Sequence, residues 1–119
     1  MRIAIAQINC TVGDITGNVA KIIDPVRQAT TAGAELVITP ELAISGYPPS
    51  DLLLRETFCQ ACAAGLMELV KAIDDITLVV GHPNFEEGKL YNAASVIHQG
   101  KIIHTYHKRI LNKSPFFNE

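Results

Sequence analysis

Apolar residues recur along the first third of the chain in patterns that predict a strand followed by a helix. The β-branched run from Arg2 to Ile8 predicts a buried strand that ends in turn-forming residues. Apolar positions then repeat at helical spacing after Asn18, which we expect to cap a helix that stops at Gly33. Pro25 lies inside that pattern, and because it lacks a backbone donor we expect a kink or a break there, with the helix surviving in bent form.

The rest of the chain predicts a second helix and four more strands. Apolar residues at helical spacing indicate a long helix over about residues 50–73, capped by Ser50 or Asp51. Residues 40–49 and 82–84 are rich in turn-forming types and predict loops. We place the strands at residues 35–39, 76–80, 90–97 and 101–106, the last two as a hairpin around Gln99 and Gly100.

This order of elements is typical of an α/β sheet with helices packed on one face. Open sheets of this class bind ligands outside the carboxyl ends of their strands. The loop that begins at Pro40 and Glu41 follows such an end, and so does the stretch from Tyr106 to Lys108. We therefore expect a functional site where these two segments meet.

The length, composition and net charge of the chain limit the kinds of protein that it can be. A chain of 119 residues that is 48% hydrophobic can form one small domain or part of one. A net charge of −2 disfavours nucleic acid and anionic membrane surfaces as partners. The first apolar run is too short for a membrane span or a signal sequence. Three cysteines are an odd number, which argues against a disulfide framework and favours a reducing, cytoplasmic location.

Two charged residues could carry chemistry at the expected site. Glu41 on a stiff Pro-rich turn could be a general base, since burial raises the pKa of a carboxyl group toward neutrality. Lys108 could stabilise an oxyanion that forms on an attacked carbonyl. Both residues also fit a simpler interpretation, because a surface glutamate and a solvated basic strand end have the same pattern.

A metal or redox site is the other chemical hypothesis. Cys59 and Cys62 have the Cys-x-x-Cys spacing, and His104 and His107 could add two ligands. The two histidines should point to opposite faces of a strand, and the cysteines lie within a helical apolar pattern. We therefore expect no metal. The sequence also contains no phosphate-binding glycine loop and no Gly-x-Ser-x-Gly elbow.

Several motifs together resemble a known family. The stretches IAIAQINCTVGD at 3–14, GAELV at 33–37 and TPEL at 39–42 resemble the nitrilase, or carbon-nitrogen hydrolase, superfamily. The run GYPPSDLL at 46–53 is similar to the glutaminase domain of glutamine-dependent NAD synthetases. The likeness covers essentially the whole chain and continues through YNAA at 91–94, GKI at 100–102 and YHK at 106–108.

The resemblance implies a fold and a set of roles. The fold would be the N-terminal portion of an α-β-β-α sandwich, truncated, so that residues 1–119 form a partial hydrolase domain. Glu41 matches the general base of the family, and Lys108 matches the lysine that stabilises the oxyanion. Tyr47 would form a wall of the glutamine pocket, and Glu119 stands where the family carries another acidic residue beside the substrate.

The family's nucleophilic cysteine has no counterpart here. It would lie further along than this sequence extends, and Cys10, Cys59 and Cys62 stand where the family has non-catalytic residues. The segment LNKSPFFNE at 111–119 also departs from the related pattern LPNYGVFDE. It carries Ser114 in place of a tyrosine, which leaves the amide substrate open.

The implied function is hydrolysis of the glutamine side-chain amide, supplying ammonia for ATP-dependent amidation of deamido-NAD to NAD in the parent enzyme. The amidase step would need no cofactor, whereas ATP and Mg would serve a synthetase domain that we expect to be absent. The parent would be a homo-oligomer, and the isolated chain would be inactive. The alternatives are another nitrilase-type hydrolase of a small amide, and a non-catalytic truncated fragment or assembly module.

Overall fold

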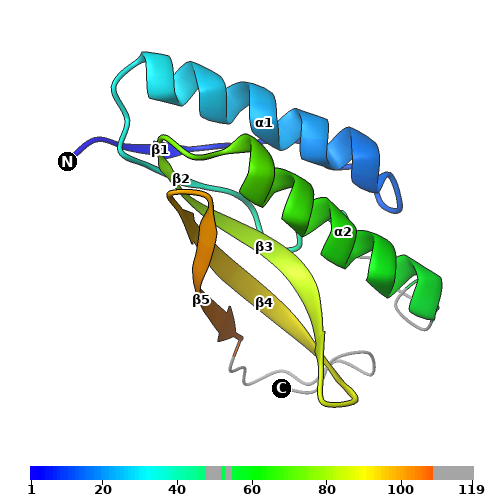
Figure 1. Cartoon of the computed structure of the whole chain (residues 1–119). Coiled ribbons are helices and arrows are strands. Elements are labelled where there is room, and N and C mark those ends of the chain that lie inside the picture. The colour runs from blue at the N-terminus through cyan, green and yellow to red at the C-terminus, as the bar shows by residue number, and fades with distance from the viewer. Residues whose placement is uncertain (48–51, 53–54, 109–119) are drawn as a thin grey trace.

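The described residues form one mixed five-stranded sheet with two helices on one face (Figure 1). The computed structural model describes residues 1–47, 52 and 55–108. The elements in chain order are β1 (Ile3–Ile5), α1 (Ile15–Thr31), β2 (Leu36–Ile38), α2 (Glu56–Ala72), β3 (Thr77–Glu86), β4 (Lys89–His98) and β5 (Lys101–His107). The sheet order is β1-β2-β3-β4-β5, with the first three strands parallel and the last two added antiparallel. The predicted α/β arrangement is confirmed.

Helix α1 begins earlier than the sequence suggested. Asp14 caps it through a side-chain oxygen that accepts the backbone N–H of Gly17 at 3.1 Å. The prediction that Asn18 caps the helix is wrong, because this residue is fully buried in the first turn and bonds two neighbouring loops. The expectation that the helix continues past Pro25 is confirmed. The helix runs through that residue, and the adjacent buried Val26 packs into the core.

Helix α2 begins at Glu56, later than the predicted start near residue 50. Arg55 precedes it with extended backbone and makes no side-chain capping bond. The expected caps, Ser50 and Asp51, lie outside the described residues. The predicted apolar face is confirmed by its middle positions, since Cys62, Leu66 and Leu69 are buried.

Strand β3 is longer than predicted. Residues 82–84, expected in a loop, lie within β3 and pair with β4. The physical reason is a second tight turn at Glu87 and Gly88, whose φ values of 51° and 76° join the two strands. The hairpin predicted around Gln99 and Gly100 is confirmed, with φ values of 50° and 71°.

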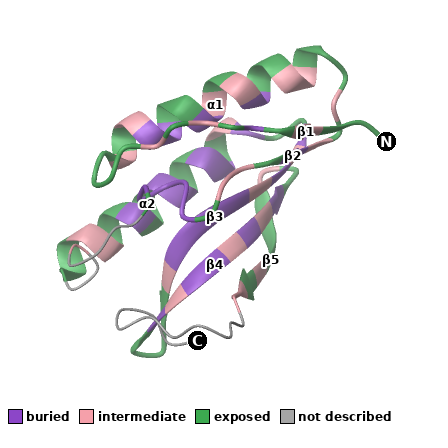
Figure 2. Ribbon diagram, turned by 180° about the vertical axis from the view of Figure 1, so that it is seen from behind, coloured by how far each residue is buried: buried purple, intermediate pink, exposed green. Residues whose placement is uncertain are grey.

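The two faces of the sheet differ in what covers them. The row Val37, Leu78 and Ile97 faces the helices, and each of these side chains is at most 1% exposed. Figure 2 shows the buried positions along β3 and β4, with exposed residues on β1 and β5. Pairing partners share a face, so a second row lies on the opposite side and contains Ile5, Ile38, Val79, Val96 and His104. We call this side the open face.

The expectation for strand β1 is wrong as well. It was predicted to be a buried strand over residues 2–8, but it spans only Ile3–Ile5 and lies at the edge of the sheet. Ile3 is 55% exposed and Ile5 is 72% exposed, because no described segment covers the open face beside them. Neither of the described helices has the length and apolar character that crossing a membrane requires.

The exposed isoleucines of the open face should make the chain associate with itself. Replacing Ile5 by lysine places a charge at the exposed end of this row, so Ile5→Lys should lower the average mass seen by light scattering at a given concentration. The matched control is Met67→Lys, at a 46% exposed position on α2. A wild-type chain that stays monomeric at high concentration, or a control that acts like Ile5→Lys, would contradict the expectation.

Candidate active site

The strand directions bring Glu41 and Lys108 to one edge of the sheet. Strands β2 and β3 are parallel, and β3 and β5 both run antiparallel to β4, so all three end at the same edge. Glu41 follows β2 by three residues, and Lys108 follows β5 directly. The Lys108 ammonium lies 2.6 Å from Oε1 of Glu41. The two residues that the sequence placed at strand ends thus form an ion pair.

Gly81 allows the Glu41 loop to lie against β3. A Cβ at this position would come within 2.6 Å of both the Pro40 carbonyl oxygen and the Leu42 nitrogen. The same close approach is held by a hydrogen bond from the Ile44 N–H to the Gly81 carbonyl at 3.2 Å. Any side chain at position 81 would displace the backbone that carries Glu41.

The loop after Glu41 is buried and partly strained. Leu42 has a φ of 51°, in the left-handed region that side chains other than glycine disfavour, and it is fully buried. The Asn18 side chain fixes the far end of this turn. Its amide donates to the carbonyls of Thr11 at 2.8 Å and Ile44 at 3.0 Å, and its oxygen accepts the Thr11 N–H. The loop after Glu41 is therefore buried, whereas Glu41 itself is exposed.

Asn92 on β4 contacts both charged residues. Its side-chain Nδ2 donates a hydrogen bond to Oε1 of Glu41, and its carbonyl accepts the backbone N–H of Lys108 at 2.8 Å. Asn92 is only 6% exposed, whereas the side chains of Glu41 and Lys108 are each 42% exposed. One buried residue thus joins two groups that solvent can reach.

A hollow of about 370 Å³ opens beside the pair on the open face. Its walls include Thr39, Gly81, Ala94 and Tyr106 in addition to the three residues of the site. The small side chains on β3 and β4 leave room there for a small molecule. The arrangement offers a carboxylate that can accept a proton and an ammonium that can stabilise negative charge on an oxygen.

The Lys108 ammonium lowers the pKa of Glu41 below the ordinary value of 4.5 by hydrogen bonding to the ionised carboxylate. Burial acts in the opposite direction, and the Asn92 amide adds to the lowering. Burial thus raises this pKa as expected, but the net shift is downward because the cation outweighs the partial burial. Glu41 is ionised at neutral pH and ready to accept a proton.

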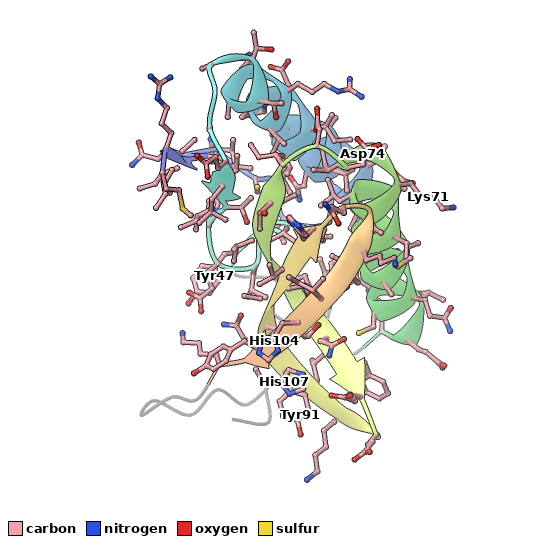
Figure 3. All side chains as sticks on the ribbon, turned by 60° about the vertical axis from the view of Figure 1, so that its left-hand side comes forward. Tyr47, Lys71, Asp74, Tyr91, His104 and His107 are labelled. Carbon is pink, nitrogen blue, oxygen red and sulfur yellow. The ribbon has the colours of Figure 1, made fainter. Side chains whose placement is uncertain are left out.

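Tyr47, the one remaining expected site residue that the structure describes, does not lie at this pair. Tyr47 is 63% exposed and does not line the hollow. Figure 3 shows Tyr47 apart from Tyr91 and His107, whose rings stack at the end of β5. Glu119 and Ser114 lie outside the described residues. The role of Tyr47 in a glutamine pocket stays a prediction.

The four residues of the metal hypothesis do not come together. His104 pairs with Val96 on the open face, whereas His107 faces the other way and contacts Asn84 at 3.0 Å. Cys59 and Cys62 lie on α2. Across the described part of the chain, no group of three or more His, Cys, Asp or Glu residues could hold a metal ion.

Comparison with known proteins places this geometry in a family. The profile described as carbon-nitrogen hydrolase matches residues 2–119, nearly the full length. The chain belongs to the carbon-nitrogen hydrolase family. Members of this family are enzymes, and the resemblance that the sequence motifs suggested is confirmed. A glutamine-dependent NAD(+) synthetase of Xanthomonas campestris is 44% identical over 120 residues, covering 100% of this chain and 22% of that protein.

Solved structures of carbon-nitrogen hydrolase relatives have the same fold. A glutamine-dependent NAD+ synthetase from Acinetobacter baumannii, in complex with ADP, is 32% identical with a TM-score of 0.91 and covers 98% of this chain and 23% of that one. An amidase from Nesterenkonia sp. is 28% identical with a TM-score of 0.82 and covers 98% of this chain and 45% of that one. The chain thus spans about a fifth of the length of the NAD synthetases that it matches.

Sequence reasoning missed two members of the site. Asn92 was noted only within the YNAA motif, and Gly81 was not noted at all. A polar residue beside two alanines in a predicted strand is a usable signal, since a buried amide must find partners. A glycine within a strand likewise indicates a close approach of another backbone.

A methyl group at Gly81 should disturb the site more than an ordinary surface change. Gly81→Ala forces Cβ against backbone atoms of the Glu41 loop, so we expect a loss of about 2 to 3 kcal/mol in unfolding free energy. The control Gly88→Ala meets nothing within 4 Å but has a φ of 76°, so it should cost only about 1 kcal/mol. Denaturant unfolding measures both, and equal losses would show that the loop does not lie against β3.

Proposed function

We propose that this chain forms the part of a glutamine amidohydrolase site that supplies the general base and the oxyanion-stabilising lysine. The observation that carries the proposal is the ion pair between Glu41 and Lys108 beside a hollow on the open face. Relatives that match the chain over its whole length support glutamine as the substrate class, since they are described as glutamine-dependent NAD synthetases.

In the proposed reaction a cysteine thiol attacks the side-chain amide carbon of glutamine. The Glu41 carboxylate takes the thiol proton, and Lys108 stabilises the negative charge on the carbonyl oxygen. Glu41 then gives the proton to the amide nitrogen, the carbon–nitrogen bond breaks, and ammonia leaves. Water next attacks the thioester while Glu41 accepts one of its protons, which is returned to the sulfur as glutamate is released.

The three cysteines of this sequence do not fit the role of the nucleophile. None of them lines the hollow beside Glu41 and Lys108. Burial raises the pKa of the Cys62 thiol to about 12, and it also raises the pKa values of Cys10 and Cys59. Each is a protonated thiol at neutral pH, which is a poor nucleophile. We therefore propose that these 119 residues alone release no ammonia from glutamine.

We propose further that the released ammonia amidates deamido-NAD in an ATP-dependent step carried out by a separate synthetase domain. The NAD synthetase relatives support this, and the ADP bound to the Acinetobacter baumannii protein supports the use of ATP. The amidase step itself would need no cofactor. We propose a cytoplasmic site of action and a homo-oligomeric complete protein.

A second candidate is hydrolysis of another small amide. The amidases of Nesterenkonia sp. favour it, because a double mutant of one of them was solved in complex with acrylamide, a small amide. That structure is 26% identical to this chain, compared with 44% for the Xanthomonas campestris synthetase. Glutamine is therefore the better supported substrate. A purely structural role as an assembly module would leave the Glu41 and Lys108 pair without a purpose.

A chimera tests the proposed function directly. This chain replaces the matching 120 residues of the Xanthomonas campestris synthetase, and NAD formation is measured with glutamine or with ammonium as nitrogen source. We expect both activities in the chimera. Glu41→Gln should abolish the glutamine-dependent rate and spare the ammonium-dependent rate, because only the first needs the base.

The ammonium-dependent rate is the control for folding of the chimera. A chimera that uses ammonium but not glutamine would contradict the proposed substrate and, if it releases ammonia from acrylamide, would favour the second candidate. Retention of glutamine-dependent activity by Glu41→Gln would exclude this residue as the base. Ammonia release by the 119-residue chain itself, at a rate that Glu41→Gln abolishes, would contradict the proposal that it lacks a nucleophile.

A further inference from the structure

Asn92 holds the site together through two different groups of one residue. Its backbone carbonyl accepts the Lys108 N–H at 2.8 Å, which fixes the point where β5 ends. Its side-chain amide donates to Oε1 of Glu41, on the loop that follows β2. Strand β3 lies between β2 and β4, so this contact spans a neighbouring strand. Asn92 therefore sets the distance between two charged side chains that are far apart in sequence.

The two oxygens of Glu41 are not equivalent. Oε1 accepts hydrogen bonds from both the Lys108 ammonium and the Asn92 amide. Oε2 has no hydrogen bond with any of the residues described here. A carboxylate held at one oxygen by two donors cannot rotate without losing both. The other oxygen is thereby directed away from the ion pair and left to a reacting group.

We propose that Asn92 is a positioning residue that ties Oε1 of Glu41 to Lys108 and leaves Oε2 as the oxygen that accepts the nucleophile's proton. The source of that proton rests on the proposed function, whereas the positioning of Glu41 by Asn92 does not. Asn92 acts through Glu41 and Lys108 and transfers no proton of its own.

The chemistry of the amide suits this task. Asn92 adds a donor without adding charge, so it does not compete with Lys108 for the carboxylate as a second cation would. An aspartate there would repel Glu41, and an apolar residue would leave the carboxylate free to turn. Because Asn92 is 6% exposed and lies opposite Pro83 on a strand with a neighbour on each side, its own side chain has little freedom. Lys108, on a long half-exposed stem, could not orient Glu41 alone.

The direction of the Glu41 pKa agrees with the geometry. The hydrogen bond from Asn92 lowers this pKa, in addition to the larger effect of Lys108. Removing the donor while keeping the space filled should therefore raise it. Leucine is close to asparagine in size and shape and has no donor, so Asn92→Leu removes the hydrogen bond without admitting water.

The experiment is a carboxyl-detected NMR titration of the chain labelled at the glutamate side-chain carbons, with Glu41→Gln to assign the signal. We expect Asn92→Leu to raise the titration midpoint of Glu41 above that of the wild type. In the unsubstituted chain, the Asn92 side-chain amide signals should shift with the same midpoint as Glu41. This second measurement needs no variant and holds even if Asn92→Leu does not fold.

Two controls separate positioning from general damage. Asn84 lies on the neighbouring strand β3 and contacts His107 on the other side of the sheet, so Asn84→Leu should leave the Glu41 midpoint unchanged. The Lys108 amide proton should stay protected from exchange in Asn92→Leu, because its acceptor is the backbone carbonyl of residue 92. A loss of that protection together with a shifted midpoint would indicate a disrupted strand pairing and overturn the proposal.

Lys108→Met distinguishes failure of this inference from failure of the proposed function. In one outcome Lys108→Met raises the titration midpoint of Glu41, Asn92→Leu does not, and the Asn92 side-chain amide signals do not shift. The ion pair is then present and the positioning role of Asn92 is wrong. If neither substitution moves the midpoint, the pair itself is absent and the proposed function loses the observation that carries it.

Discussion

The site depends on one steric constraint, the contact between the backbone of residues 40–42 and the bare backbone of Gly81. Glu41 follows β2 and Lys108 follows β5, with two strands between them. Their side chains meet because the Glu41 loop approaches β3 more closely than any residue with a Cβ would permit. The positive φ of Leu42 and the buried Asn18 amide belong to the same requirement, since both shape the turn that follows. The strand directions bring Glu41 and Lys108 to the same edge of the sheet, and Gly81 leaves the space that the Glu41 loop occupies.

The ion pair contributes more to chemistry than to stability. Both side chains are 42% exposed, and exposed ion pairs are generally worth about 0 to 1 kcal/mol. The stability of the chain comes instead from the row of buried residues between the sheet and the helices, on the opposite side from the site. The charged site and the apolar core thus lie on opposite faces of the sheet. Charged groups can stay hydrated and reactive on the open face while the core remains apolar.

The sequence predicted the elements whose signals are local and periodic. The apolar face of α2 and the hairpin at Gln99 and Gly100 follow from spacing and turn chemistry. Glu41 and Lys108 could be placed at strand ends for the same reason. The errors arose where tertiary contacts decide the outcome. Asn18 had the right residue type for a cap, but its amide is used by two loops instead, and β3 extends through Pro83 because a turn beyond it pairs the strand.

The site itself could be predicted only in part. Resemblance to a family indicated the two charged residues, but nothing local in the sequence indicates that Asn92 reaches Glu41, fifty-one positions away. The lowered pKa of Glu41 likewise depends on a cation sixty-seven positions along the chain. Such long-range contacts are fixed by strand order and register, which no periodic pattern encodes.

The central claim is that Glu41 and Lys108 interact directly, and a double-mutant cycle measures this most directly. Unfolding free energies of the wild type, Glu41→Gln, Lys108→Met and the double variant should give a coupling of about 0.5 to 1 kcal/mol at neutral pH. Since the folded pKa of Glu41 is lowered, the coupling is fully present above the ordinary value of 4.5 and is lost as the pH falls through the folded pKa. Additive effects of the two substitutions at neutral pH would contradict the account.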